Sequence, residues 1–207
     1  MARYTGAVCK LCRREGTKLF LKGERCMSDK CALNKRFTPP GQHGAARKKA
    51  TGYSIQLREK QKAKRSYGLL EKQFHMYYDM ADKMRGVTGD NMLSLIERRL
   101  DNVVYRMHIA VSRAQARQFV NHGLITVNGH RVNIASYLTK AGDIIAIKEN
   151  KRDKAPFTAL KETSITGIPA WLTFDPATLS GTVVRIPERA DIDLNVQEHM
   201  IVELYSK

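Results

Sequence analysis

Four cysteines near the N-terminus place the strongest constraint on how this chain begins to fold. Cys9-x2-Cys12 is followed, after thirteen residues, by Cys26-x4-Cys31. Two close pairs separated by a loop give the spacing of a tetrahedral thiolate site for zinc. We therefore predict one structural Zn²⁺ ion held by Cys9, Cys12, Cys26 and Cys31. Four protein ligands leave no open position for a water or a substrate, so this ion would hold the fold and perform no chemistry.

The sequence around the cysteines favours zinc over the other uses of such pairs. Residues 1–36 lack a long periodic apolar pattern, so a metal would fold a module too small to bury a core of its own. Arginines and lysines flank the sulfurs, and nearby positive charge is expected to lower the pKa of a thiol. A redox-active Cys-x-x-Cys pair is typical of a thioredoxin-like βαβ unit, and the sequence after Cys12 does not have that pattern. Disulfides are disfavoured because they need an oxidising compartment. An iron–sulfur cluster stays open as an alternative without supporting spacing.

The positive charge of the chain is concentrated in its first third. The whole chain has 36 Lys and Arg against 20 Asp and Glu, a formal net charge of +16. Residues 1–68 hold 18 of these cations and 4 of the acids, whereas residues 168–207 hold 3 and 6. A field of this density predicts a polyanionic partner, either nucleic acid or an anionic membrane surface. Residues 56–65, QLREKQKAKR, lack the apolar face that a membrane-bound helix needs, which favours nucleic acid.

The remaining patterns predict an α+β chain that works in the cytoplasm. No apolar stretch approaches the ~20 residues of a membrane span, and residues 1–11 lack the apolar core of a signal peptide. Apolar periodicity predicts helices over residues 53–85, interrupted at Gly68, and a helical face from residue 93 to 107. Ser112 and Gln115 have the spacing of a capping box. Asn128-Gly129 predicts a hairpin, followed by a strand over residues 144–147.

Residues 92–148 are therefore predicted to form a compact helix-helix-hairpin-strand unit that reads RNA. Its arginines and hairpin-tip amides would present donors in a fixed pattern to phosphates, as recognition of RNA by shape and backbone requires. Together with the basic N-terminal third they form our predicted RNA-binding set, which comprises Arg3, Lys10, Arg13, Arg14, Lys22, Arg25, Lys35, Arg36, His43, Arg47, Lys48, Lys49, Arg58, Lys62, Lys64, Arg65, Arg98, Arg99, Arg106, Arg113, Arg117, Asn128, His130 and Arg131.

Several segments closely resemble a known family of ribosomal proteins. ERRLDNVVYRM (97–107), SRAQARQFVNHG (112–123), TVNG (126–129) and AGDIIAI (141–147) resemble the RNA-binding domain named after ribosomal protein four of the small subunit. The similarity extends to RYTG (3–6), TPPGQHG (38–44), YGLLEKQF (67–74), WLTFD (171–175) and IVELYSK (201–207). The chain thus resembles the bacterial small-subunit ribosomal protein four family over nearly its whole length, and its four cysteines resemble the zinc-bearing branch.

This resemblance implies both a domain organisation and a role. Residues 1–91 would form a zinc knuckle and a mainly helical domain that residues 170–207 complete, with an inserted α+β RNA-binding domain at residues 92–169. The implied role is to bind the 5′ domain of small-subunit ribosomal RNA early, at a helical junction, and to nucleate assembly of the subunit. The implied surroundings are the mRNA entry channel and neighbouring small-subunit proteins, among them the number five family, with a contribution to translational accuracy.

Two alternative functions share the same RNA-binding domain. Pseudouridine synthases have a catalytic aspartate in an Arg-Leu-Asp context, which Arg99-Leu100-Asp101 matches. That tripeptide lies inside the predicted binding helix, where Asp101 is expected to be a surface residue or an arginine partner, and the roughly 60 residues after Ile147 are fewer than a catalytic domain normally needs. A stand-alone RNA-binding factor would not be expected to carry the cysteines, PPGQHG and the YSK tail together. We predict no catalytic residues.

Overall fold

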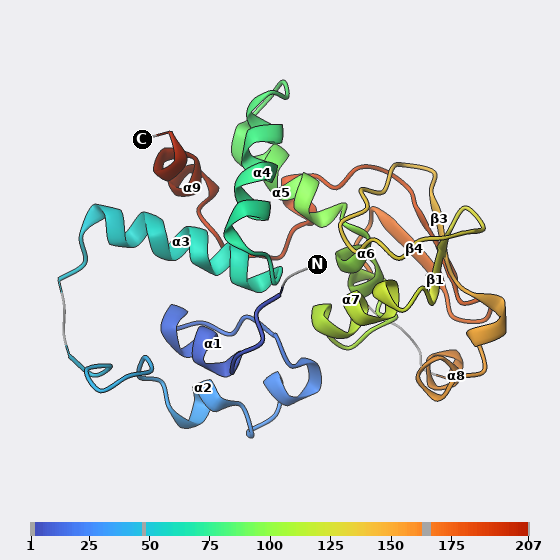
Figure 1. The fold of residues 1–207 in the computed structure, drawn as a ribbon, viewed down its shortest axis with the longest axis horizontal. Helices are drawn as coiled ribbons and strands as arrows, with labels where there is room; N and C mark the ends of the chain where they lie inside the picture. The colour runs from blue at the N-terminus through green and yellow to red at the C-terminus, as the bar shows by residue number, and fades with distance from the viewer. Residues whose placement is uncertain (1–2, 47–48, 163–166, 207) are drawn as a thin grey trace. The chain divides into compact units, whose positions relative to one another are not determined.

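The chain folds into two compact units. The computed structural model describes residues 3–46, 49–162 and 167–206. Unit 1 consists of Met1–Met92 and Leu194–Lys207, and unit 2 consists of Leu93–Asp193. The chain first passes from unit 1 to unit 2 within helix α5 (Thr88–Glu97), and it returns after Asp193 (Figure 1).

Unit 1 is helical in the part of the chain that is described. Short elements come first, namely α1 (Cys9–Glu15), the 3-10 helix η1 (Gly23–Cys26) and α2 (Ala32–Lys35). Longer helices follow, namely α3 (Gly52–Ser66), α4 (Glu71–Asp82) and, after the return from unit 2, α9 (Glu198–Tyr205). The predicted interruption at Gly68 is confirmed, since this glycine has a left-handed φ of 65° between α3 and α4.

The helices of unit 1 are joined by an apolar seam and by one carboxylate. Phe74 and Tyr77 of α4 and Ile201 of α9 are fully or almost fully buried, and α9 lies beside α3 (Figure 1). At the end of α9 the Tyr205 hydroxyl donates to Glu71 Oε1 at 2.8 Å. The same carboxylate accepts from Lys60 Nζ at 2.5 Å and from Lys64 Nζ at 2.6 Å. Glu71 therefore connects three helices of the unit.

This arrangement predicts an acid-sensitive contribution to the stability of unit 1. Burial acts to raise the pKa of Glu71, but the hydrogen bonds from Lys60, Lys64 and Tyr205 outweigh it and lower the pKa from 4.5 to about 2. A depressed pKa contributes stability that is fully present above pH 4.5 and is lost as the pH falls towards 2. Glu71→Gln should therefore flatten the fall in unfolding free energy of unit 1 over this window. Urea unfolding followed by helical circular dichroism from pH 2 to 6 measures the effect.

The matched control for this prediction is Asp82→Asn, which removes an exposed carboxylate from α4. Its unfolding free energy should keep the pH dependence of the unaltered protein. If Glu71→Gln and Asp82→Asn give the same profile, the assigned contribution of Glu71 is wrong.

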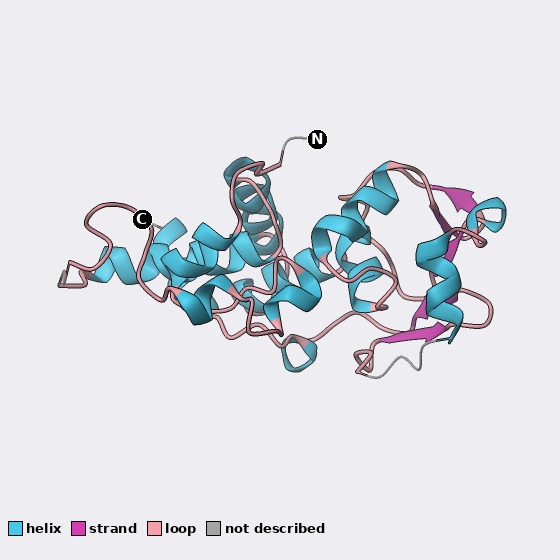
Figure 2. Ribbon diagram, turned by 90° about the horizontal axis from the view of Figure 1, so that it is seen from below, coloured by secondary structure: helices cyan, strands magenta, loops and turns pink. Residues whose placement is uncertain are grey.

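Unit 2 combines helices with a small antiparallel sheet. Its helices are the end of α5, α6 (Leu100–Arg106), α7 (Arg113–Asn121) and α8 (Ala155–Glu162), together with the 3-10 helices η2 (Glu149–Lys151) and η3 (Arg189–Asp191). Its strands are β1 (Ile125–Val127), β2 (His130–Arg131), β3 (Ile144–Ile147), β4 (Leu172–Asp175) and β5 (Ser180–Val183). They are ordered β2-β1-β3-β5-β4 and appear in magenta in Figure 2.

The predicted local signals of unit 2 are confirmed, except that the capping box is half formed, since the Gln115 side chain accepts from the backbone N–H of Val111 at 2.8 Å. Ser112 begins α7, where its hydroxyl accepts from the backbone N–H of Gln115 at 3.3 Å. Asn128 and Gly129 both have positive φ, 51° and 80°, and connect β1 to β2 in a tight hairpin. The strand predicted over residues 144–147 is β3.

The helical face predicted from residue 93 to 107 is interrupted. Helix α5 ends at Glu97 and α6 begins at Leu100, because Arg99 adopts an extended conformation and forms a β-bridge with Leu138. The backbone N–H of Leu100 donates to the carbonyl of Tyr137 at 2.8 Å. The loop before β3 thus satisfies the first donors of α6, which a continuous helix would have satisfied itself.

The predicted boundary at residue 170 needs correction. The family resemblance implies that residues 170–207 complete the first domain, but only residues 194–207 cluster with unit 1. Strand β5 pairs with β3, with Gly181 opposite Ile145, and β4 pairs with β5. Trp171 is fully buried in the core of unit 2. Residues 170–193 belong to unit 2 because the backbone donors and acceptors of β3 are completed by β5.

Candidate nucleic-acid interface

The cations of residues 3–46 and Lys49, which we call the basic arm, face solvent for the most part. Arg13 is half-buried and donates its Nε–H to the carbonyl of Thr38 at 2.9 Å. The predicted residues Arg47 and Lys48 lie outside the described residues. In the described part, His43 and nine Lys and Arg residues are exposed, the latter being Arg3, Lys10, Arg14, Lys22, Arg25, Lys30, Lys35, Arg36 and Lys49. The basic arm therefore presents positive charge as a phosphate-binding surface requires.

Two of the predicted arginines of α3 turn towards a buried carboxylate. The Glu15 side chain, at the end of α1, is fully buried and accepts from Arg58 Nη1 at 3.1 Å and from Arg65 Nη1. Burial raises the pKa of Glu15, while Arg58 and Arg65 act to lower it. These two arginines therefore hold α3 against α1, in addition to any contact with RNA, which stays a prediction.

The predicted lysines of α3 are also engaged within unit 1. Lys62 Nζ lies 2.6 Å from Glu59 Oε1, and Lys64 Nζ lies 2.6 Å from Glu71 Oε2. The sequence shows these cations but not the carboxylates that meet them. Contact between Lys62 or Lys64 and RNA stays a prediction. In this structure Lys62 is paired within α3, whereas Lys64 joins α3 to α4.

The four cysteines are thiols gathered at the start of unit 1. Cys12, Cys26 and Cys31 are buried and Cys9 is half-buried. Burial raises the pKa of the Cys12 thiol, and Cys26, Cys9 and Cys31 raise it further, while a hydrogen bond from the backbone of Leu19 lowers it. For Cys12 this corrects the expectation of a lowered thiol pKa, because desolvation of its thiolate is the largest influence.

The structure does not confirm the predicted metal site. Within residues 3–46, 49–162 and 167–206, no group of three or more His, Cys, Asp or Glu side chains is arranged to hold a metal ion. The zinc site stays a prediction, supported by the burial and mutual influence of the thiols.

Arg99 and Arg117 are buried in unit 2 around one aspartate. Arg99 is 1% exposed, and its Nε and Nη2 donate to Asp101 Oδ1 at 3.0 Å and Oδ2 at 2.7 Å. Arg117 Nη1 lies 3.4 Å from Asp101 Oδ2. The structure assigns both arginines to the interior of unit 2, in place of the predicted contact with RNA. The expectation that Asp101 is an arginine partner is confirmed.

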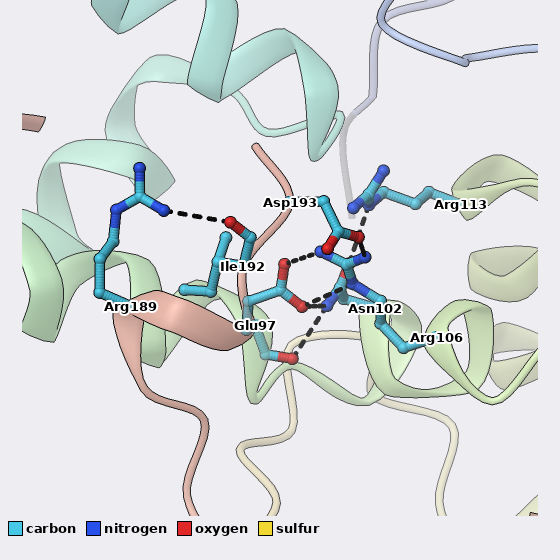
Figure 3. Close-up of polar contacts among 7 residues, drawn as sticks. All are labelled: Glu97, Asn102, Arg106, Arg113, Arg189, Ile192 and Asp193. Carbon is cyan, nitrogen blue, oxygen red and sulfur yellow. Dashed lines mark hydrogen bonds and ion pairs between the residues drawn. The ribbon is translucent and has the colours of Figure 1, made fainter. Parts of the chain in front are cut away.

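Arg106 and Arg113 belong to a second polar network, drawn in Figure 3. Arg106 binds the buried carboxylate of Glu97, with its Nη2 2.7 Å from Glu97 Oε1. Arg113 Nε donates to Asn102 Oδ1 at 2.8 Å, and its guanidinium lies 4.5 Å from the centre of the Tyr105 ring. Each of these predicted arginines is therefore held in one orientation.

The remaining predicted residues of unit 2 lie near the sheet. Arg98 is half-buried and donates to the carbonyl of Thr139 at 2.9 Å; burial lowers its pKa and Asp143 raises it. Asn128 donates from its side chain to Asp143 Oδ1 at 2.9 Å, which fixes the hairpin. His130 and Arg131 are exposed at the hairpin. Of this group, His130 and Arg131 are the residues that unit 2 offers to a partner in the way the sequence predicts.

Comparison with known proteins gives the family of the chain. Residues 3–97 match the ribosomal protein S4/S9 N-terminal domain, and residues 98–145 match the S4 domain. The chain is 59% identical over 207 residues to small ribosomal subunit protein uS4A of Symbiobacterium thermophilum, covering all of both chains. It belongs to the ribosomal protein uS4 family. Members from Acetivibrio thermocellus and Clostridioides difficile are 57% and 56% identical, again over the whole of both chains.

The two uS4 family matches meet at a structural break. The first ends at Glu97, where α5 ends, and the second begins at Arg98, before the extended Arg99. The RNA-binding module of the family thus begins where α5 gives way to α6. In the described residues no helix is long and apolar enough to cross a membrane.

Proposed function

We propose that this chain is a structural component of the small ribosomal subunit that binds the ribosomal RNA. The observation that carries this proposal is membership of the uS4 family over the whole chain, at 56–59% identity to the three relatives named above. The exposed cations of the basic arm and of the hairpin supply the matching electrostatic surface. The uS4 family consists of structural ribosomal proteins without enzymatic activity. Its members work in the cytoplasm as part of the ribosome. A stand-alone RNA-binding factor or a pseudouridine synthase is not favoured.

The finer role follows the resemblance seen in the sequence. The chain would bind the 5′ domain of small-subunit ribosomal RNA at a helical junction and nucleate assembly. It would lie near the mRNA entry channel beside neighbouring small-subunit proteins, including the number five family, and support translational accuracy. RNA helices are recognised mostly by their shape and backbone. Arginines held in one orientation, such as Arg113, are therefore suited to bind phosphates where RNA helices meet.

Binding to defined RNA fragments tests this role. The full chain should bind a 5′-domain fragment of small-subunit ribosomal RNA at least about tenfold more tightly than a 3′-domain fragment of equal length, a difference of about 1.4 kcal/mol. Filter binding at one fixed salt concentration measures both affinities. Equal affinity for the two fragments would contradict the assignment to the 5′ domain.

We also propose that the four cysteines hold one structural zinc ion. Support for this proposal comes from the spacing of the four cysteines and from their environment, because Cys12, Cys26 and Cys31 are buried and each of the other three cysteines raises the pKa of Cys12. When bound, zinc would displace the thiol protons and cross-link α1 to the segment that contains η1 and the start of α2. The metal would then stabilise the fold of the basic arm, which lacks an extensive apolar core.

The zinc proposal predicts a local loss of structure. Elemental analysis of the purified native chain should find about one zinc per chain, as expected of a site with four protein ligands. The double variant Cys9→Ser and Cys12→Ser should lose the metal and unfold residues 1–36, whereas fluorescence of Trp171 should report an intact unit 2. A native chain that contains neither zinc nor iron would refute the ligand assignment.

A further inference from the structure

The side chain of Arg106 is held in place by the buried carboxylate of Glu97. Glu97 is 1% exposed, and it accepts from Arg106 Nε at 3.1 Å and from Nη2 at 2.7 Å. Two parallel hydrogen bonds of this kind set both the position and the plane of a guanidinium (Figure 3). Arg106 therefore cannot turn away from its place at the end of α6 without breaking a buried ion pair.

One amide extends this arrangement to a second arginine. Asn102 Nδ2 donates to the backbone carbonyl of Glu97 at 3.0 Å and to Glu97 Oε2. The amide oxygen of Asn102 accepts from Arg113 Nε at 2.8 Å. Glu97 thus orients Arg106 directly and Arg113 through Asn102, which brings two guanidinium groups from α6 and α7 into one network.

A second carboxylate meets this network from the solvent side. Asp193 Oδ2 lies 2.5 Å from Arg106 Nη1, an edge of the guanidinium that Glu97 does not use. The Asp193 side chain is 78% exposed, whereas that of Arg106 is 11% exposed. A carboxylate so well hydrated loses little when it leaves an ion pair, because exposed pairs contribute little net free energy.

We propose that Asp193 occupies, in the absence of RNA, the position at Arg106 that a backbone phosphate of ribosomal RNA takes on binding. This proposal rests on the proposed function and names one phosphate subsite within it. A phosphate oxygen would accept from the same Nη1 edge, and Glu97 and Asn102 would act as positioning residues for Arg106 and Arg113. Asp193 would then swing into water, where its charge is solvated.

The structure argues against a purely structural role for the Asp193 ion pair. The segment before Asp193 is already held by one contact to α5 and by one ion pair within the segment itself. The Ser94 hydroxyl donates to the Pro187 carbonyl at 2.9 Å, and Arg185 binds both oxygens of Asp191 at 2.7 and 2.8 Å. The ion pair of Asp193 is thus not needed to hold this segment on unit 2, which leaves its carboxylate able to exchange.

A pair of matched variants tests the proposal in the full chain. Asp193→Asn and Glu188→Gln each remove one exposed charge from the same segment, and each weakens one arginine–carboxylate pair. The RNA used is the 5′-domain fragment of small-subunit ribosomal RNA, with affinity measured by filter binding. We expect Asp193→Asn to bind about threefold more tightly than Glu188→Gln, which corresponds to removing a weak exposed competitor at Arg106. Equal affinities, or weaker binding by Asp193→Asn, would overturn the proposal.

A double-mutant cycle separates competition at Arg106 from a general charge effect. In an Arg106→Gln background the gain from Asp193→Asn should disappear, because no guanidinium remains for the two anions to share. Arg106→Lys is the second background in case Arg106→Gln, which leaves Glu97 without this partner, does not fold by Trp171 fluorescence. In the Arg106→Lys background the gain in affinity from Asp193→Asn should be smaller, because a lysine lacks the second N–H edge of a guanidinium. If Asp193→Asn raises the affinity by the same factor in whichever Arg106 variant is folded, the proposal that a phosphate displaces Asp193 from Arg106 is refuted. Failure of the unaltered chain to bind the fragment would instead contradict the proposed function.

Discussion

Raising the salt concentration from about 50 to about 200 mM is expected to weaken binding of this chain to small-subunit ribosomal RNA by about 10³- to 10⁵-fold, the range for proteins that neutralise 6–10 phosphates. The reason is counterion release, since each phosphate that a Lys or Arg neutralises frees a condensed cation. The basic arm alone exposes nine Lys and Arg residues in its described part, which is within that range. Filter binding at several salt concentrations measures the slope.

Paired variants identify which cations contribute to that slope. Lys35→Gln with Arg36→Gln removes two exposed cations of the basic arm and should reduce the log–log slope by about 2. Lys62→Gln with Lys64→Gln removes the same charge from α3, where both lysines are paired with carboxylates, and should change the slope less. A larger effect of the α3 pair would show that the internal ion pairs of α3 open when RNA binds.

Asp101→Ala is expected to destabilise unit 2 by about 3–5 kcal/mol, because removal of one partner leaves buried charge uncompensated. Arg99 is almost fully buried and Arg117 is 8% exposed, so water cannot replace the lost carboxylate at little cost. Urea unfolding followed by fluorescence of Trp171, the single tryptophan of the chain and a fully buried residue of unit 2, measures the loss.

Asp153→Ala is the matched control for this prediction. It removes an exposed aspartate from the same unit and should leave the unfolding midpoint close to that of the unaltered chain. If Asp101→Ala unfolds at the same urea concentration as Asp153→Ala, the buried ion pair is not a determinant of the fold of unit 2. RNA binding of Asp101→Ala is meaningful only at urea and temperature conditions where Trp171 reports a folded unit.

Local sequence signals predicted the parts of the fold that depend on neighbouring residues. The start of α7 at Ser112 and the hairpin at Asn128-Gly129 each follow from the conformational preferences of a few adjacent residues. The break between α3 and α4 at Gly68 is of the same kind. These features need no knowledge of distant parts of the chain.

The features that the sequence analysis missed depend on contacts between distant residues. The interruption at Arg99 is stabilised by the loop around Leu138, and the assignment of residues 170–193 to unit 2 depends on pairing of β5 with β3. Neither has a local signal, because the hydrophobic pattern of residues 93–107 is compatible with one helix and short strands such as β4 and β5 have weak patterns.

The contacts of the candidate site also depend on residues that are distant in the sequence. The sequence shows where cations are abundant, and the exposed basic arm follows from that abundance. It does not show that Arg58 and Arg65 meet Glu15, which lies 43 and 50 residues away along the chain. Nor does it show that Glu97 orients Arg106, nine residues later. Carboxylates decide which cations are available to RNA, and their partners are set by the tertiary fold.

Co-sedimentation with ribosomal subunits tests the central claim most directly. Purified full-length chain, added to small subunits that lack this protein, should sediment with them through a sucrose gradient at low salt and be released as the salt concentration rises. It should not sediment with large subunits under the same conditions. A chain that stays at the top of the gradient in the presence of such small subunits would contradict its role as a ribosomal RNA-binding component of that subunit.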